Sequence, residues 1–167
     1  MIQKNNILLE QASELVSLEE FDEAFHIYDK ILSIDPKNIS ALIDKALTLQ
    51  RIGKNSHAVK LFDKALKIEP KNIDALIGKG STLHAQGKFA HAIICYDIAL
   101  KIDPKFPITL AYKGLSLGEQ GKIKDALSYF KQALAIDKDY DLAKISKKKA
   151  LELLKSFNMP FPATENN

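Results

Sequence analysis

The sequence predicts an all-α protein, a solenoid of helix–turn–helix repeats, and three observations lead to this prediction. Pro36, Pro70 and Pro104 stand 34 residues apart. Within each period the apolar residues recur at helical spacing, and no strand-like alternation of apolar and polar residues is present. A period of this size is typical of paired-helix repeats, which stack because one helix pair cannot bury its own apolar face.

The period divides most of the chain into four repeats and leaves one helix without a partner helix. An open end of a repeat stack needs a cap, and this last helix is suited to the role. We expect residues 1–157 to form a single domain. Its parts are the repeats at residues 5–38, 39–72, 73–106 and 107–140 and a capping helix at 141–157, followed by a tail at 158–167.

An apolar stripe marks the first helix of each repeat. The fourth, eighth and eleventh residues of a repeat share one helix face by their i, i+4, i+7 spacing. The eighth residue is small, so a second helix could approach closely at that point. In chain order these positions are Leu8, Ala12 and Leu15, then Leu42, Ala46 and Leu49, then Leu76, Gly80 and Leu83, then Leu110, Gly114 and Leu117.

The second helix of each repeat has a small residue followed four positions later by an aromatic residue. This spacing again places both side chains on one helix face. We expect the small residue to receive the first helix and the aromatic ring to fill the core. The pairs are Ala24 and Tyr28, Ala58 and Phe62, Ala92 and Tyr96, and Ala126 and Phe130.

The turns between helices carry residues suited to helix ends. Gly53, Gly87 and Gly121 follow first helices, where a left-handed residue often ends a helix and glycine adopts it without steric cost. The prolines follow second helices, which they cannot continue. Asn38 and Asn72 then stand at the position of a helix N-cap, with a side-chain oxygen for the open amides of the next helix.

The capping helix combines apolar and basic residues. Leu142, Ile145, Leu151 and Leu154 are expected to pack inward. The lysines at 144 and 147–149 are expected to face water, although a patch for an anionic partner is the alternative interpretation.

Taken together, these residues resemble the tetratricopeptide repeat family over residues 5–140. Glu19 replaces the turn glycine in the first repeat, and Lys138 replaces the closing proline in the fourth, as is common in terminal repeats. Asn55 is polar where the other repeats have an apolar residue, and the pattern does not explain it. The resemblance implies a right-handed α-solenoid whose stacked first helices line a concave groove for a peptide or partner helix.

By position, the resemblance assigns thirteen residues to this groove. Its floor would be largely apolar and its charge mildly acidic, while several of the residues could instead pack between adjacent helices. The clamp of Lys, Asn and Arg with which some family members hold acidic chaperone C-termini is missing here. The groove residues are Leu9, Ser13, Ile43, Asp44, Leu47, Gln50, Asp74, Ile77, Ser81, His84, Ala111, Tyr112 and Leu115.

We therefore expect a non-catalytic protein-interaction scaffold whose partner is an apolar or mildly basic segment of another protein. One alternative is a self-assembling homo-oligomer in which the segment 157–163 (FNMPFPA) lies in a neighbour's groove. A second alternative is a nucleic-acid-binding helical repeat. The Leu and Ile groove residues and the small net charge of +3 argue against it.

Composition and spacing give no indication of a catalytic, cofactor or metal site. His91 and Cys95 at i, i+4 could supply two corners of a zinc site, but a structural zinc takes four ligands and no second pair is near in the sequence. No apolar run approaches the ~20 residues that span a bilayer, and the N-terminus lacks the features of a secretory signal. A single cysteine fits a reducing compartment, so we expect a cytoplasmic protein without a membrane partner.

Overall fold

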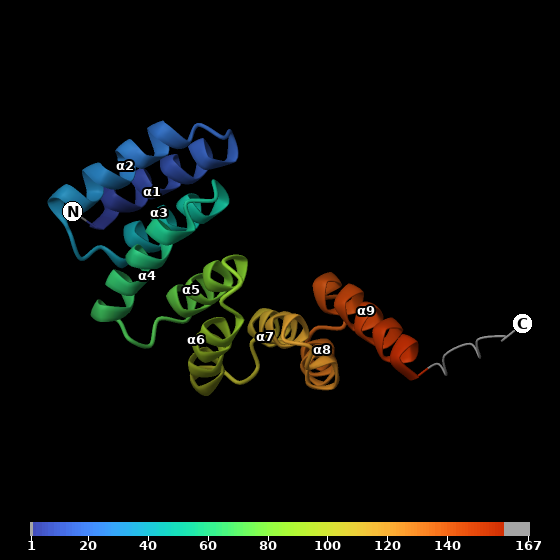
Figure 1. Cartoon of the computed structure of the whole chain (residues 1–167). Coiled ribbons are helices and arrows are strands. Elements are labelled where there is room, and N and C mark those ends of the chain that lie inside the picture. The colour runs from blue at the N-terminus through green and yellow to red at the C-terminus, as the bar shows by residue number, and fades with distance from the viewer. Residues whose placement is uncertain (1, 159–167) are drawn as a thin grey trace, which may run out of the picture. The chain divides into compact units, whose positions relative to one another are not determined.

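The computed structural model describes the backbone of residues 2–158 and the side chains of residues 5–156. Within this range it contains nine α-helices and no strand, as predicted, and the chain has an all-α helical repeat fold (Figure 1). Apart from its first residue, the tail expected at 158–167 lies outside the described residues. The helices are α1 (Ile2–Ser17), α2 (Phe21–Ile34), α3 (Ile39–Arg51), α4 (Asn55–Ile68), α5 (Ile73–Ala85), α6 (Phe89–Ile102), α7 (Pro107–Glu119), α8 (Ile123–Ile136) and α9 (Asp141–Asn158).

The chain forms two compact units, Met1–Ile102 and Asp103–Asn167, which we call the N-terminal and C-terminal units. In the N-terminal unit the helices of each repeat pack as a pair, and α2 packs on α3 and α4 on α5. The first helices also meet, α1 with α3 and α3 with α5. In the C-terminal unit α7 packs on α8, and α9 packs on both.

The turns after the first helices share one hydrogen-bonding pattern. Gly53, Gly87 and Gly121 have φ of +75°, +72° and +76°, as the prediction requires. Their left-handed backbone lets the next amide reach back to the carbonyl oxygen five residues earlier, at 2.8 Å from Lys54 N to Leu49 O. The first repeat forms the same turn with a non-glycine residue.

The two predicted asparagine caps form. Asn38 Oδ1 accepts from Ala41 N at 3.0 Å, and Asn72 Oδ1 accepts from Ala75 N at 2.9 Å. Each cap satisfies one of the amides that a helix start leaves open. The starts of α3 and α5 are therefore set by local chemistry.

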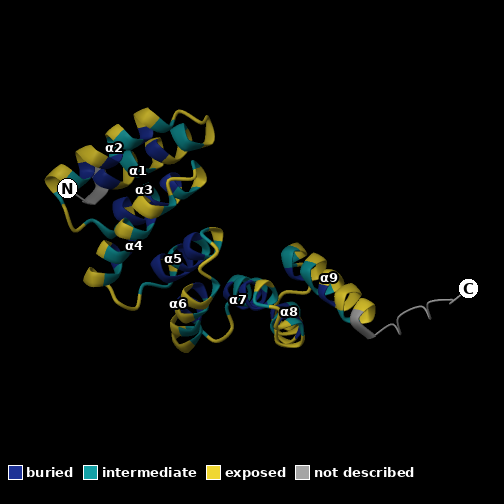
Figure 2. Ribbon diagram, in the orientation of Figure 1, coloured by how far each residue is buried: buried dark blue, intermediate teal, exposed yellow. Residues whose placement is uncertain are grey.

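In repeats 3 and 4 the aromatic ring of the second helix packs against the small residue of the first. A Cβ added to Gly80 would lie 2.5 Å from Tyr96 Cε1, and one added to Gly114 would lie 2.6 Å from Phe130 Cε1. Tyr96 is only 1% exposed. These contacts confirm the predicted close approach, and the buried faces of paired helices turn toward each other in Figure 2.

Successive repeats of the N-terminal unit stack through the third, seventh and tenth residues of the first helix. In α3 these are Ala41, Lys45 and Thr48. Ala41 is fully buried and Thr48 is 3% exposed, while Lys45 pairs with Asp29 on α2. Repeat 3 does the same with Lys79, whose Nζ lies 2.7 Å from an Asp63 oxygen on α4. Small residues let the helices approach, and the lysine stem covers the edge of the contact.

The capping helix α9 uses this same stacking face, which corrects the prediction made for it. Ala143 is fully buried and Ala150 is 6% exposed, whereas Ile145 is 66% exposed and Leu151 38%. Ile145 and Leu151 therefore do not pack inward as predicted. The reason is that α9 approaches α8 through its small residues two helical turns apart, so the largest apolar side chains lie off the contact.

Candidate peptide-binding surface

The predicted groove residues of the N-terminal unit lie on α1, α3 and α5, and most of them reach solvent. Leu47 is 44% exposed, and Ser13 and Asp74 are also exposed. We call the predicted groove residues on α1, α3 and α5 the first-helix face. Its half-buried members are Leu9, Asp44, Gln50, Ser81 and His84.

Three predicted groove residues are buried. Ile43 is 7% exposed, Ile77 9% and Ala111 fully buried. Ile43 belongs to a core cluster that also contains Phe62 and Ala75, so it packs between α3 and its neighbours. These three residues therefore fit the alternative interpretation, in which they pack between adjacent helices, because those helices cover the fifth position of repeats 2, 3 and 4.

A polar link joins α3 to α5 across the first-helix face. Gln50 Nε2 donates to Ser81 Oγ at 2.9 Å, and Ser81 Oγ donates to the Gly78 carbonyl oxygen at 3.0 Å. His84 stacks edge-on against Phe89, with 5.2 Å between ring centroids. The contact between Gln50 and Ser81 thus joins repeats 2 and 3, and the ring contact joins the two helices of repeat 3.

The charge on the first-helix face is negative. Burial raises the pKa of Asp44, and the nearby Asp74 carboxylate raises it further. Neither carboxylate forms an ion pair with another described residue. The two acidic groups, one from each of two successive repeats, therefore give the first-helix face its negative charge.

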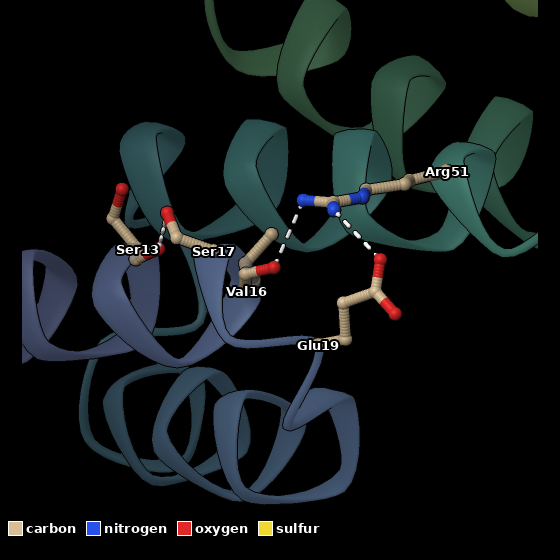
Figure 3. A network of polar contacts seen from close by, with 5 residues as sticks. All are labelled: Ser13, Val16, Ser17, Glu19 and Arg51. Carbon is tan, nitrogen blue, oxygen red and sulfur yellow. Dashed lines mark hydrogen bonds and ion pairs between the residues drawn. The ribbon is translucent and has the colours of Figure 1, made fainter.

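At the N-terminal edge of this unit a basic residue links the first two repeats. Arg51 Nη1 donates to the Val16 carbonyl oxygen at 2.8 Å, and Nη2 lies 3.3 Å from Glu19 Oε1 (Figure 3). The guanidinium also lies 5.5 Å from the centroid of the Phe21 ring. Arg51 is thus engaged in holding the α1–α2 turn.

The C-terminal unit has a pocket of about 270 Å³ between α7, α8 and α9. The predicted groove residue Leu115 lines it, while Tyr112 lies half-buried elsewhere on α7. The groove prediction did not include the other lining residues, and those on α9 lie beyond the fourth repeat, where the assignment of groove residues ended. The repeat count could have found those on α9, since Ile145 stands at the same repeat position as Ile43 and Ile77. The additional lining residues are Gly118, Glu119, Ile123, Ala126, Phe130, Ile145, Ser146, Lys149, Ala150 and Leu153.

The histidine and cysteine considered as a possible pair of metal ligands lie in different environments. His91 is exposed, whereas Cys95 is 6% exposed. Burial raises the pKa of the Cys95 thiol, which favours the unreactive protonated form. In the described part of the chain no three His, Cys, Asp or Glu side chains are placed to hold a metal ion. Among the described helices, none has the length and apolar character to cross a membrane.

Comparison with known proteins gives one family. Models described as tetratricopeptide repeat match residues 43–107, and residues 6–38 together with 113–140. No curated protein matches the sequence significantly.

Solved structures superpose on the chain at low sequence identity. The structure described as "Functional Characterization of Pseudomonas Aeruginosa pilF" has a TM-score of 0.84 at 18% identity, covering 93% of this chain and 71% of that chain. The crystal structure of MamA protein has a TM-score of 0.74 at 19% identity, with 93% and 90% covered. The first TPR of Spaghetti (RPAP3), bound to the HSP90 peptide SRMEEVD, has a TM-score of 0.68 at 18% identity, with 72% and 96% covered. At these identities the likeness concerns the fold.

Proposed function

Because the chain belongs to the tetratricopeptide repeat family, we propose that it is a non-catalytic interaction scaffold whose first-helix face binds a basic, amphipathic segment of a partner protein. The observation that carries the proposal is that Asp44 and Asp74, on successive first helices, form no ion pair with any described residue, while burial and the Asp74 carboxylate raise the pKa of Asp44. Two carboxylates that repel each other without a cation gain free energy when a ligand supplies one.

An apolar contact would accompany the charge. Leu47 lies one helical turn from Asp44 along α3 and keeps 44% of its surface exposed. A partner side chain that covers an exposed leucine gains roughly 1.5–3 kcal/mol at most. A segment with a lysine or arginine one turn away from an apolar residue would therefore match the face in both chemistry and spacing.

An acidic ligand does not fit this face. The RPAP3 repeat is bound to the peptide SRMEEVD, which ends in acidic residues. In the present chain Asp44 and Asp74 would repel such a peptide, and the residues of the clamp are replaced by Leu9, Ser13 and Ile43. The expected partner is therefore of opposite charge to that peptide.

The free, buried Cys95 supports a reducing compartment, since nothing in the chain pairs it in a disulfide. We infer a cytoplasmic location from it. Measurement of the thiol state of the native protein by alkylation under non-reducing conditions tests this inference.

The test of the binding proposal uses two amphipathic peptides that differ only in the sign of their charged residues. Fluorescence anisotropy should show binding of the Leu/Lys peptide and none of the Leu/Glu peptide. The variant Asp44→Asn/Asp74→Asn should lose at least ~10-fold in affinity, about 1.4 kcal/mol. The matched control Asp22→Asn/Glu23→Gln removes the same charge from α2 and should bind as the wild type does. Equal losses in both variants would mean that the peptide responds to net charge alone, and the proposed site would be wrong.

A further inference from the structure

The outer face of α9 differs from that of every other first helix. Its fourth and eighth repeat positions are Lys144 and Lys148, where the other repeats have leucine and a small residue. A partner helix cannot pack there as in a repeat, because it would have to bury lysine ammonium groups. This face is therefore not a vacant repeat position but a charged surface.

Four of the five lysines of α9 line a hollow between α8 and α9. Its volume is about 420 Å³, and Leu134 and Leu151 contribute its apolar surface. Its charged lining residues are four lysines, Lys144, Lys147, Lys148 and Lys155, and one glutamate, Glu152. The helix as a whole has five lysines against two acidic residues. Within the described residues, Lys144 is the one lysine of α9 with an ion pair, to Asp139 and Asp141. With four lysines against one glutamate, the lining of the hollow has a net positive charge beside an apolar surface.

The first repeat carries the opposite charge. From Glu10 to Asp29 there are seven acidic residues and no lysine or arginine. Leu18, at the start of the α1–α2 connection, is 64% exposed, and the exposed Glu14 and Glu20 flank it in sequence. An exposed leucine bordered by carboxylates is the chemical complement of the lysine-walled hollow.

We propose that the α1–α2 turn of one copy of the chain docks into the lysine-walled hollow on α9 of a second copy, with Leu18 entering between Leu134 and Leu151. Charge complementarity identifies the occupant. One chain carries both surfaces. Its net charge of +3 is small, although the first repeat is acidic and the last helix is basic. Because the two surfaces differ, the contact is heterologous and can extend to further copies.

This contact does not involve the first-helix face, so it is independent of the proposed partner binding. It uses Leu18, Glu14 and Glu20 on one copy and lysines of α9 on the other. Asp44→Asn/Asp74→Asn should therefore leave self-association unchanged. Failure of either proposal is thus distinguishable from failure of the other.

The test is sedimentation velocity of the full chain over a range of concentrations, at salt from about 0.05 M to about 0.5 M. At low salt the weight-average sedimentation coefficient should rise with concentration, and at high salt the rise should disappear because the charges are screened. The variant Lys148→Glu/Lys155→Glu, and separately Glu14→Lys/Glu20→Lys, should each weaken association at least tenfold. The control Lys122→Glu/Lys124→Glu makes the same charge change on and just before α8, away from the hollow, and should associate as the wild type does.

Mixing the two weakened variants gives the decisive readout. In each variant alone, the two surfaces of the proposed contact carry like charges. In the mixture, the unaltered acidic turn of Lys148→Glu/Lys155→Glu can bind the unaltered lysines of Glu14→Lys/Glu20→Lys. A complex should therefore reappear in the mixture. Three results would overturn the proposal: association that depends only on net charge, a mixture that stays monomeric, or a wild-type chain that stays monomeric at every concentration. In the last case, binding to vesicles containing phosphatidylserine would assign the hollow to an anionic membrane surface instead.

Discussion

Arg51, the last residue of α3, holds Glu19, which is the one non-glycine residue with left-handed φ in the described range 2–158. Glu19 has φ of 63° and occupies the place that Gly53, Gly87 and Gly121 take in the later repeats. The Arg51 guanidinium contacts the Glu19 carboxylate at 3.3 Å and the Val16 carbonyl oxygen at 2.8 Å (Figure 3). A residue of repeat 2 thus supports the strained turn of repeat 1.

Two substitutions of Glu19 distinguish the energetic cost of its left-handed backbone from the contribution of its ion pair with Arg51. Glu19→Gly and Glu19→Ala both remove the exposed contact to Arg51, which is worth little in solvent. Only glycine removes the steric cost of the left-handed backbone, so Glu19→Gly should be more stable than Glu19→Ala by about 1 kcal/mol. Chemical denaturation followed by circular dichroism measures the difference. Equal stability of the two variants would mean that the turn changes its backbone when the side chain is removed.

The contact between Gly80 and Tyr96 leaves no room for a methyl group. An added Cβ would lie 2.5 Å from the buried ring, so Gly80→Ala should destabilise the protein by ~1–3 kcal/mol despite the better helix propensity of alanine. Gly118→Ala is the matched control, because its Cβ would have its nearest neighbour at 3.9 Å. That variant should gain up to ~1 kcal/mol. Thermal melting compares the two, and a Gly80→Ala protein as stable as the wild type would contradict the close approach.

The pH dependence of stability should report on Asp44. The pKa of Asp44 is higher in the folded protein than in the unfolded chain. Between these two pKa values the folded protein therefore binds more protons than the unfolded chain does, and its stability falls as the pH rises through this range. Asp44→Asn should therefore be more stable than the wild type at pH 7, by less than ~1 kcal/mol because solvent reaches the side chain. The difference should vanish below the unfolded pKa. Denaturation curves from acidic to neutral pH measure it, and a gain that persists at low pH would point to packing rather than charge.

Substitution of Leu47 should disable binding without unfolding the chain. Leu47→Lys places the charge on a side chain that is 44% exposed, where the ammonium reaches water. We expect a small change in melting temperature and at least a ~10-fold loss of affinity for the Leu/Lys peptide, about 1.4 kcal/mol. Ile43→Lys, one turn earlier on α3, should instead unfold or strongly destabilise the protein, because Ile43 is 7% exposed. If both variants melted alike, the distinction between face and core on α3 would be wrong.

Much of this fold could be predicted from the sequence because interactions between residues close in sequence determine it. The caps at Asn38 and Asn72 and the left-handed glycines act within a few residues of themselves, so their roles follow from residue type and position. The requirement for a small residue at Gly80 was also predictable, because the 34-residue period places a small residue at the same position in every repeat, whereas its contact with the ring of Tyr96 appears only in the structure. A repeated sequence therefore determined the helices, their pairing and their order.

Tertiary structure decided which of the outward-pointing residues remain exposed. Periodicity gives the angle of Ile43 around its helix but not the neighbouring helix that covers it, and Leu47 one turn later stays open. In α9 the same limit led the large Ile145 to be predicted inside, where the small Ala143 lies. The physical reason is that burial and the raised pKa of Asp44 depend on groups a repeat away in sequence, whose distance is set by how closely the helices pack.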